Sequence, residues 1–225
     1  MPTEQIARNL EKATAGKRLL DHPFYRAWAG GSLTIEDLSF YSSQYWRQVE
    51  AFPGYLGSLI ERMEPGSARE IVEANLADER DDDHPALWRQ FAEGLGCDEA
   101  ALETAAVEPE TERCVAAFSQ GSRSASLPFA LGMLYGYESQ TPEVSHTKVA
   151  GLREHYGIDG EPLRYFELHG ELDVEHAGAL VEAIEQVAVT DADRDEAEAG
   201  ARAGAAAIYG LLDGVARARE LVPAV

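Results

Sequence analysis

Three residues with metal-binding side chains stand at helical spacing in one segment of the chain. His169, Asp173 and His176 occupy positions i, i+4 and i+7 in YFELHGELDVEHAGALVEAIEQV. An α-helix has about 3.6 residues per turn, so these side chains lie along one face and point into one volume. Imidazole nitrogen and carboxylate oxygen suit iron, manganese or zinc. A solvated helix face has the same spacing, so ligands from other segments must decide between the two interpretations.

The rest of the sequence predicts an all-α fold. Apolar residues recur at helical intervals, and no convincing run alternates as a β-strand does. Thr34 and Thr190 are predicted N-caps, Pro53 is expected to interrupt a helix, and residues 161–187 are predicted to carry the three residues above. No repeat or linker divides the chain, so residues 1–225 are predicted to form one domain, a compact bundle of about eight helices.

Glu138 is the first further candidate ligand. It lies in FALGMLYGYESQ, where apolar neighbours such as Leu134 and Tyr137 are expected to face the core. An ionised carboxylate in such a segment needs a partner, and a metal ion would supply one. The alternative is that Glu138 ends its helix in solvent.

Glu79 and His84 are a second candidate pair. Glu79 lies on an apolar helix face, and His84 opens the next predicted helix directly before a proline. The intervening residues 81–83 are interpreted as a solvated acidic loop and helix cap. With Glu138 and the residues of 161–187, the pair completes three carboxylates and three imidazoles. Such a set suits a dinuclear, O2-activating site, because carboxylates bridge two cations and imidazoles complete the coordination.

The charge of the chain argues against several classes of partner. Its formal net charge is −21, and only three of the 19 basic residues are lysines. Such a surface repels phosphate backbones and anionic lipids, so we expect neither nucleic acid nor membrane as a partner. No apolar run of about 18 residues and no signal peptide is recognisable, which favours a cytoplasmic location. The acidity is typical of proteins adapted to a high-salt cytoplasm, where screening makes dense carboxylates tolerable.

Lys148 is notable in a chain with so few lysines. It lies ten residues after Glu138, beyond Pro142, on a short predicted helix whose apolar residues face inward. Burial lowers the pKa of an amine and so favours its nucleophilic form, which would fit a chemical role. The alternative is an ordinary surface lysine paired with one of the many carboxylates.

These motifs together resemble those of a known family. NLADE…HPALW, YGYE, a TKV ten residues past that glutamate, and HGELDVEH are similar to elements of the CADD family. These proteins are the folate-associated members of the TenA/PqqC group, which has the haem-oxygenase-like helical fold. The resemblance extends from HPFY at residue 22 through the last predicted helix. The H-x3-D-x2-H element, together with the Tyr-Glu of YGYE, separates metal-binding members from TenA-type thiaminases, which use a cysteine nucleophile.

The resemblance implies a metal centre of dinuclear iron, or of mixed manganese and iron, and usually a homodimer. It also implies self-sacrificing p-aminobenzoate synthesis, in which O2 chemistry, supported by an external reductant, cleaves an internal tyrosine whose ring becomes the product. Tyr25 in HPFYRAW would be the sacrificed residue and Lys148 the amino donor, and other tyrosines would relay electrons or radicals. Carried over residue by residue, the metal ligands are Glu79, His84, Glu138, His169, Asp173 and His176, and the relay tyrosines are Tyr41, Tyr137 and Tyr165.

Several alternatives stay open on the sequence alone. The interval from the first carboxylate to its histidine is shorter here than in the family pattern, so Asp78, or an acid among residues 81–83, is an alternative to Glu79. A conventional di-iron oxidase, such as an N-oxygenase or a decarboxylase, would act on an external substrate and leave Tyr25 intact. A non-catalytic interaction protein would tolerate loss of the ligands. Thiamin hydrolysis is disfavoured, because both cysteines lie outside the candidate site segments.

Overall fold

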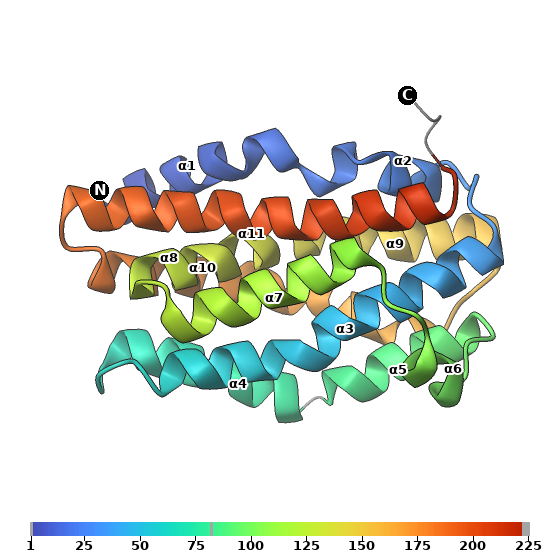
Figure 1. The fold of residues 1–225 in the computed structure, drawn as a ribbon, viewed down its shortest axis with the longest axis horizontal. Helices are drawn as coiled ribbons and strands as arrows, with labels where there is room; N and C mark the ends of the chain where they lie inside the picture. The colour runs from blue at the N-terminus through green and yellow to red at the C-terminus, as the bar shows by residue number, and fades with distance from the viewer. Residues whose placement is uncertain (1, 82, 222–225) are drawn as a thin grey trace.

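Helices make up almost all of the part of the chain that the computed structural model describes, residues 2–81 and 83–221 (Figure 1). No strand occurs within these ranges, which confirms the predicted all-α class, and none of the described helices is long and apolar enough to cross a membrane. In chain order the elements are α1 (Pro2–Thr14), the 3₁₀ turns η1 (Ala15–Lys17) and η2 (Leu19–Asp21), α2 (Pro23–Ala29), α3 (Ile35–Ile60), α4 (Ser67–Asp81), α5 (His84–Gly94), α6 (Glu99–Thr104), α7 (Pro109–Ser124), α8 (Leu127–Glu138), α9 (Thr141–Tyr156), the 3₁₀ turn η3 (Glu161–Leu163), α10 (Arg164–Val187) and α11 (Asp191–Ala218).

The described residues contain eleven α-helices, more than the expected number of about eight. The excess comes partly from α2 and α6, which have seven and six residues and are too short to produce a recognisable period. The predicted caps are confirmed. Thr34 Oγ1 accepts a hydrogen bond from the backbone N–H of Asp37, and the Asp37 side chain accepts one from the Thr34 N–H in return. Thr190 forms the same reciprocal cap at the start of α11.

The prediction that Pro53 interrupts a helix was wrong, because α3 continues through it. A proline inside a helix removes one backbone hydrogen bond and costs about 3 kcal/mol in isolation. Here Phe52 and Tyr55 are buried on either side of it, and Tyr55 Oη donates to the backbone oxygen of Val115 on α7 at 3.3 Å. Tertiary packing therefore outweighs the local preference of the proline.

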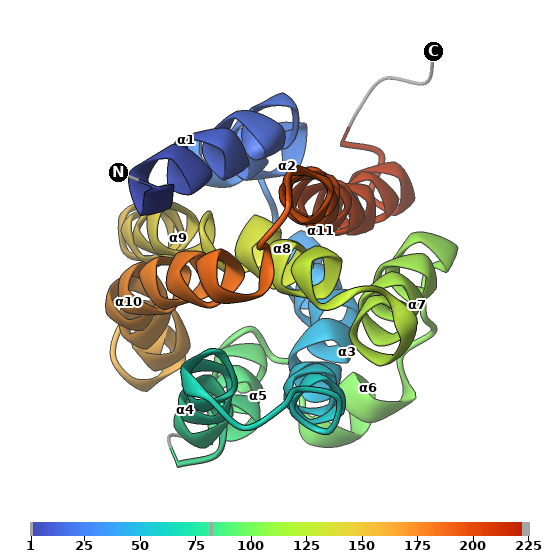
Figure 2. The same ribbon diagram turned by 90° about the vertical axis from the view of Figure 1, so that its left-hand side faces the viewer.

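Helix α8 runs through the middle of the bundle, with α7, α10 and α11 around it (Figure 2). The backbones of α8 and α11 contact each other directly. A Cβ on Gly136 would lie 2.2 Å from the Ala201 oxygen, and a Cβ on Gly204 would lie 2.2 Å from the Met133 oxygen. Glycine is therefore required at these contacts. The close approach keeps nearly all of α8 buried, including Glu138 at its last position.

Candidate metal centre

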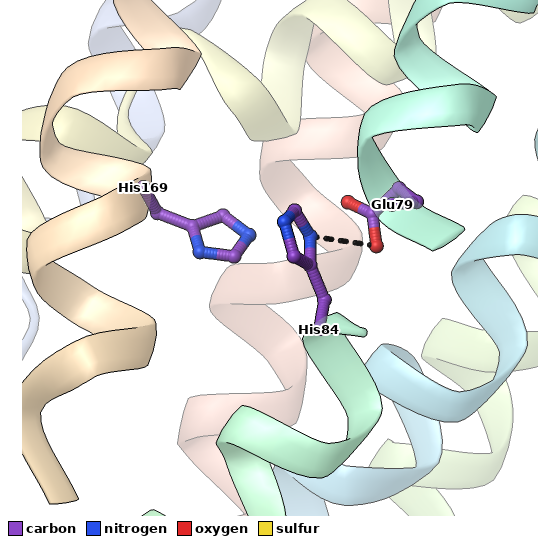
Figure 3. A group of neighbouring side chains, drawn as sticks. All are labelled: Glu79, His84 and His169. Atoms are coloured by element: carbon purple, nitrogen blue, oxygen red, sulfur yellow. Dashed lines mark ion pairs between the residues drawn. The ribbon is translucent and has the colours of Figure 1, made fainter. Parts of the chain in front are cut away.

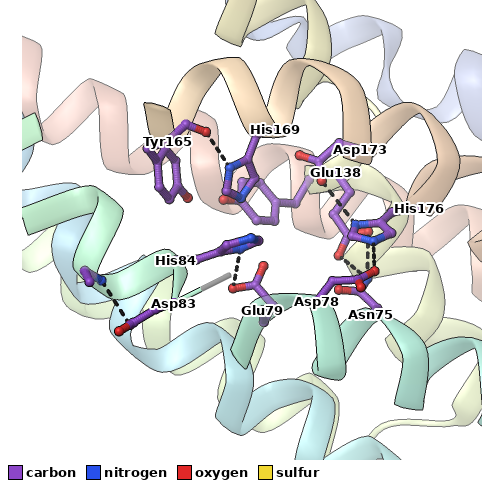
Figure 4. Close-up of polar contacts among 12 residues, drawn as sticks. Asn75, Asp78, Glu79, Asp83, His84, Glu138, Tyr165, His169, Asp173 and His176 are labelled. Atoms are coloured by element: carbon purple, nitrogen blue, oxygen red, sulfur yellow. Dashed lines mark hydrogen bonds and ion pairs between the residues drawn. The ribbon is translucent and has the colours of Figure 1, made fainter. Parts of the chain in front are cut away.

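The six predicted ligands come from α4, α5, α8 and α10 and line one region of the interior (Figure 4). Five of them are buried, and the His176 side chain is only 10% exposed. Glu138 does not end its helix in solvent, as the alternative interpretation held. The structure thus brings all six side chains together, in two neighbouring clusters.

The junction between α4 and α5 directs the first two of these side chains. Asp83 is the N-cap of α5 and has a left-handed backbone (φ 46°), and its side chain accepts a hydrogen bond from the Ala86 N–H. Aspartate is one of the few residues with a β-carbon that adopts this conformation readily. The turn reverses the chain, so that Glu79 Oε2 lies 2.9 Å from His84 Nδ1 (Figure 3). Asp82, another acid considered above, lies outside the described residues.

The first cluster consists of Glu79, His84 and His169, whose ligand atoms all lie within 4.8 Å of one another. The two imidazole rings are 4.4 Å apart between centroids. His169 Nδ1 lies 2.7 Å from the backbone oxygen of Tyr165, which can only accept a hydrogen bond. The proton of His169 is therefore on Nδ1, and the lone pair of Nε2 is left for the cluster. Burial, with the neighbouring His84, lowers the pKa of His169 to about 3, so its ring is neutral.

The second cluster gathers around His176, about 10 Å further along α10. His176 Nδ1 lies 3.3 Å from Asp173 Oδ1, and its Nε2 lies 3.0 Å from Asp78 Oδ2. Glu138 lies beside this group, and the Asn75 amide donates to its two oxygens at 3.1 and 3.2 Å. Of the acids proposed as alternatives to Glu79, Asp78 thus contacts the second cluster, whereas Asp81 is exposed on α4.

The carboxyl groups of the two clusters lack enough positive charge among the described residues. Burial, followed by repulsion from Asp173, raises the pKa of Glu138 to about 8. Burial also raises the pKa of Asp173 to about 6. Burial alone would lower the pKa of His176, but its hydrogen bond to Asp173 and the negative charge of Glu138 outweigh this and raise it to about 9. A cation at this position would relieve the repulsion between the acids.

The unsatisfied polar atoms of the site fit a bound cation. His84 is 1% exposed, its Nδ1 contacts Glu79 Oε2 at 2.9 Å, and its Nε2 has no hydrogen-bond partner among the described residues. Buried polar atoms without partners are rare in proteins, and they often belong to sites that bind an ion. Since the donors are imidazole nitrogens and carboxylate oxygens, the residues suit a divalent transition metal.

Lys148 lies in an aromatic pocket next to this site. It is buried, and Nζ donates to Tyr41 Oη at 2.8 Å, while Tyr41 Oη lies 3.2 Å from Tyr25 Oη. Nζ is also 5.3 Å from the centre of the Tyr25 ring and 4.7 Å from that of Phe166. Burial lowers the pKa of the amine well below 10.5, and no ion pair of Lys148 occurs within the described residues. The alternative of a surface lysine paired with a carboxylate is therefore wrong.

Aromatic rings connect the two regions. The Tyr165 ring stacks on His169 with 4.1 Å between centroids, and the Trp88 ring is 4.8 Å from Tyr165. Trp88 in turn lies 6.0 Å from Tyr41. A continuous series of ring contacts therefore runs from the first cluster to the hydroxyl that Lys148 contacts.

Sequence reasoning missed three residues of the site. Tyr45 lies one helical turn after Tyr41, and its hydroxyl donates to Tyr137 at 3.1 Å, so the i, i+4 spacing was an available signal. Trp88 was readable only as core packing, because its position between two tyrosines depends on the tertiary fold. Asn75 stands one turn before Glu79 on α4, but nothing in the sequence pairs it with Glu138.

The bundle and its histidine–carboxylate clusters define an all-α metalloprotein class with ligands on facing helices. A solved TenA homologue from Pseudomonas syringae has the same fold, with a TM-score of 0.82 at 19% identity over 95% of this chain and 92% of that one. A family described as iron-containing redox enzymes matches residues 39–209, and the chain belongs to that family. It is therefore an oxidoreductase, as predicted.

Two curated relatives are similar over most of their length. The 4-aminobenzoate synthase of Nitrosomonas europaea is 35% identical over 227 residues, which cover 96% of this chain and 92% of that protein. The 4-aminobenzoate synthase of Chlamydia trachomatis is 35% identical over 188 residues, or 82% of this chain and 81% of that protein. These comparisons confirm the family resemblance that the sequence motifs indicated.

Proposed function

We propose that this protein makes p-aminobenzoate (4-aminobenzoate) from its own Tyr25 side chain, with Lys148 as the amino donor, for folate or related pterin biosynthesis. The names of the relatives support the product. The observation that carries the assignment of residues is the contact of Lys148 with Tyr41, and of Tyr41 with Tyr25. A buried lysine without a counter-ion among the described residues is costly, and a structural role offers no reason to place one here.

The chemistry of the product matches these two side chains. In p-aminobenzoate a carboxyl carbon and an amine stand para to each other on a benzene ring. The Tyr25 side chain already has this skeleton from Cβ to Cζ, so cleavage of its Cα–Cβ bond and oxidation of Cβ would supply the carboxylate. The lysine nitrogen must then form a bond to Cζ while Oη leaves as water, and the Cε–Nζ bond of Lys148 must break, with O2 and the external reductant balancing the electrons. The donor nitrogen is therefore required at the hydroxyl end of Tyr25, the region where Lys148 Nζ lies.

The residues of the two clusters would hold a dinuclear centre of iron, or of manganese and iron. The ligands that we assign are Glu79, His84, Glu138, His169, Asp173 and His176. The metals would supply O2 activation, with O2 and an external reductant as co-substrates. The inward-facing Nε2 of His169 and the unpartnered Nε2 of His84 support this assignment.

The surrounding side chains have defined tasks in this proposal. The aromatic rings around the buried Lys148 exclude water, and burial lowers the pKa of the amine, which favours the neutral form whose lone pair can attack the oxidised ring. Tyr165 and Trp88 would conduct electrons from the Tyr25 region toward the metals, and Tyr41 would accept a proton or an electron from Tyr25. Tyr137 and Tyr45 form a second hydrogen-bonded pair that would serve the same relay.

Aerobic incubation without any organic substrate tests the proposal. The metal-free protein is loaded with Fe(II), with or without Mn(II), and given a reductant and O2. We expect at most about one p-aminobenzoate per chain, because each chain has one sacrificial residue. Peptide mapping should find side-chain loss at Tyr25 and a change at Lys148. Uptake of O2 with no product and an intact Tyr25 would instead indicate a conventional oxidase with an external substrate.

Homodimer formation, a cytoplasmic location and adaptation to high salt stay predictions from the sequence. Sedimentation of the purified protein at low and high salt tests the homodimer and the adaptation to high salt. We expect a dimer, and unfolding when salt is removed, because the net charge of −21 is then unscreened.

A further inference from the structure

The two clusters differ in their exposure to solvent. The His84 side chain is 1% exposed and that of Glu79 is 8% exposed, so the first cluster is closed. In the second cluster the exposed fraction rises from 5% at Asp173 to 10% at His176 and 46% at Asp78. Polar side chains therefore form a continuous connection from the surface to the buried carboxylates, and Asp78 is its outermost member.

Two consecutive residues of α4, Asp78 and Glu79, contact different clusters of the site. Glu79 Oε2 lies 2.9 Å from His84 Nδ1, and Asp78 Oδ2 lies 3.0 Å from His176 Nε2. Two donor atoms that bind one cation at about 2.1 Å and at right angles are about 3.0 Å apart. Each carboxylate–imidazole pair thus has the spacing of neighbouring ligands on one ion.

His176 cannot bind a cation without losing one of its present partners. Both of its ring nitrogens contact carboxylates, Asp173 at Nδ1 and Asp78 at Nε2. The Nε2 side faces the exposed Asp78. A cation that arrives from solvent therefore meets an oxygen and a nitrogen already at ligand spacing, without any rearrangement of the buried groups.

We propose that Asp78 is an additional ligand of the second metal position, and that this position loads from solvent through it. The inference rests on the proposed dinuclear centre and extends it by a residue outside the six assigned ligands. The competing explanation is a surface ion pair between Asp78 and His176. Such a pair would contribute little to folding and nothing to metal binding.

Cobalt(II) titration of the metal-free protein distinguishes a metal ligand at Asp78 from a surface ion pair. Co(II) accepts the same nitrogen and oxygen donors, and its visible absorption reports the ligand field. We would compare the wild type with Asp78→Asn, Asp78→Glu, Glu79→Gln and Asp81→Asn. The last variant is the matched control, because Asp81 is an exposed acid on the same helix. Thermal melting of each metal-free variant verifies that the fold persists.

We expect the wild type and Asp81→Asn to bind two equivalents of Co(II). Asp78→Asn should weaken one equivalent by at least about 10- to 100-fold and slow its uptake in stopped flow. Glu79→Gln should weaken the other equivalent, and Asp78→Glu should restore much of the loss. If Asp78→Asn binds two Co(II) ions at wild-type affinity and rate, the inference is overturned. If the wild type itself binds none, the proposed metal centre fails as well.

Discussion

Replacing Lys148 by methionine should stabilise the folded protein while it abolishes product formation. The amine is buried among aromatic rings, with no counter-ion among the described residues, and burial lowers its pKa well below 10.5. Exchange of a buried ion pair for apolar residues of similar volume is often stabilising by about 1–4 kcal/mol, and we expect a gain of this order for an amine that is buried without a counter-ion. Loss of the hydrogen bond from Nζ to Tyr41 Oη offsets about 1 kcal/mol of this gain.

The net gain should therefore be about 0–3 kcal/mol near pH 7. For a chain of this size, a change of 1 kcal/mol shifts the melting temperature by about 2–4 °C, so we expect a rise of up to roughly 12 °C. Differential scanning calorimetry in the presence of a chelator measures it on the metal-free protein. Lys12→Met, at an exposed lysine of α1, is the control and should change stability by less than about 0.5 kcal/mol.

The increase in stability on Lys148→Met should also depend on pH. Between the lowered pKa of folded Lys148 and 10.5, the unfolded chain binds a proton that the folded chain does not. The contribution of Lys148 to the free energy of unfolding of the wild type therefore rises with pH in this window, by up to about 1.4 kcal/mol per unit. Lys148→Met lacks this dependence, so its advantage should shrink as the pH approaches 10.5. A variant less stable than the wild type at pH 7, or an advantage independent of pH, would refute the argument.

Three further predictions concern single side chains. Tyr25→Phe keeps the ring but removes the hydroxyl that the amine must replace, so mass spectrometry should find no p-aminobenzoate and an unaltered chain after aerobic incubation. Product from this variant would exclude Tyr25 as the source. Gly136→Ala would place a Cβ 2.2 Å from the Ala201 oxygen, so it should lower the free energy of unfolding by about 1–3 kcal/mol or more. An unchanged melting temperature would contradict the close packing of α8 and α11. The pKa of folded Glu138 is raised from 4.5 to about 8, so the metal-free wild type should lose stability as pH rises through this range. Glu138→Gln removes this group and should lose less stability, the remaining loss coming from the raised pKa values of Asp173 and His176. Urea unfolding in which the two proteins lose stability equally would rule out a buried, protonated carboxyl at position 138.

Much of the site could be predicted because it depends on helical periodicity. His169, Asp173 and His176 lie on one face of α10, as their spacing requires, and this face is directed inward. Burial of Glu138 followed from its apolar neighbours. The contact of Glu79 with His84 was less accessible, because it depends on a left-handed residue, Asp83, in the turn between two helices.

The contacts of Lys148 could not be derived from sequence periodicity. Its amine meets Tyr41 across 107 residues of sequence, and only the tertiary packing of α9, α3 and α2 places Tyr25 beside them. An aromatic residue between Phe24 and Trp28 is typical of core packing, and only the family resemblance singles out Tyr25. Pro53 illustrates the converse case: its local preference predicts a break, but tertiary packing keeps helix α3 continuous through it.

Isotope labelling tests the central claim most directly. The chain has only three lysines, so a Lys12→Arg, Lys17→Arg variant retains Lys148 as its single lysine. This protein, prepared with side-chain ¹⁵N-lysine and uniformly ¹³C-labelled tyrosine, is incubated with Fe(II), reductant and O2 in unlabelled buffer. We expect p-aminobenzoate that carries the tyrosine carbons and the lysine nitrogen in the same molecule. Product without either label, formed over many turnovers, would contradict it, because the ring and the amine would then come from outside the chain.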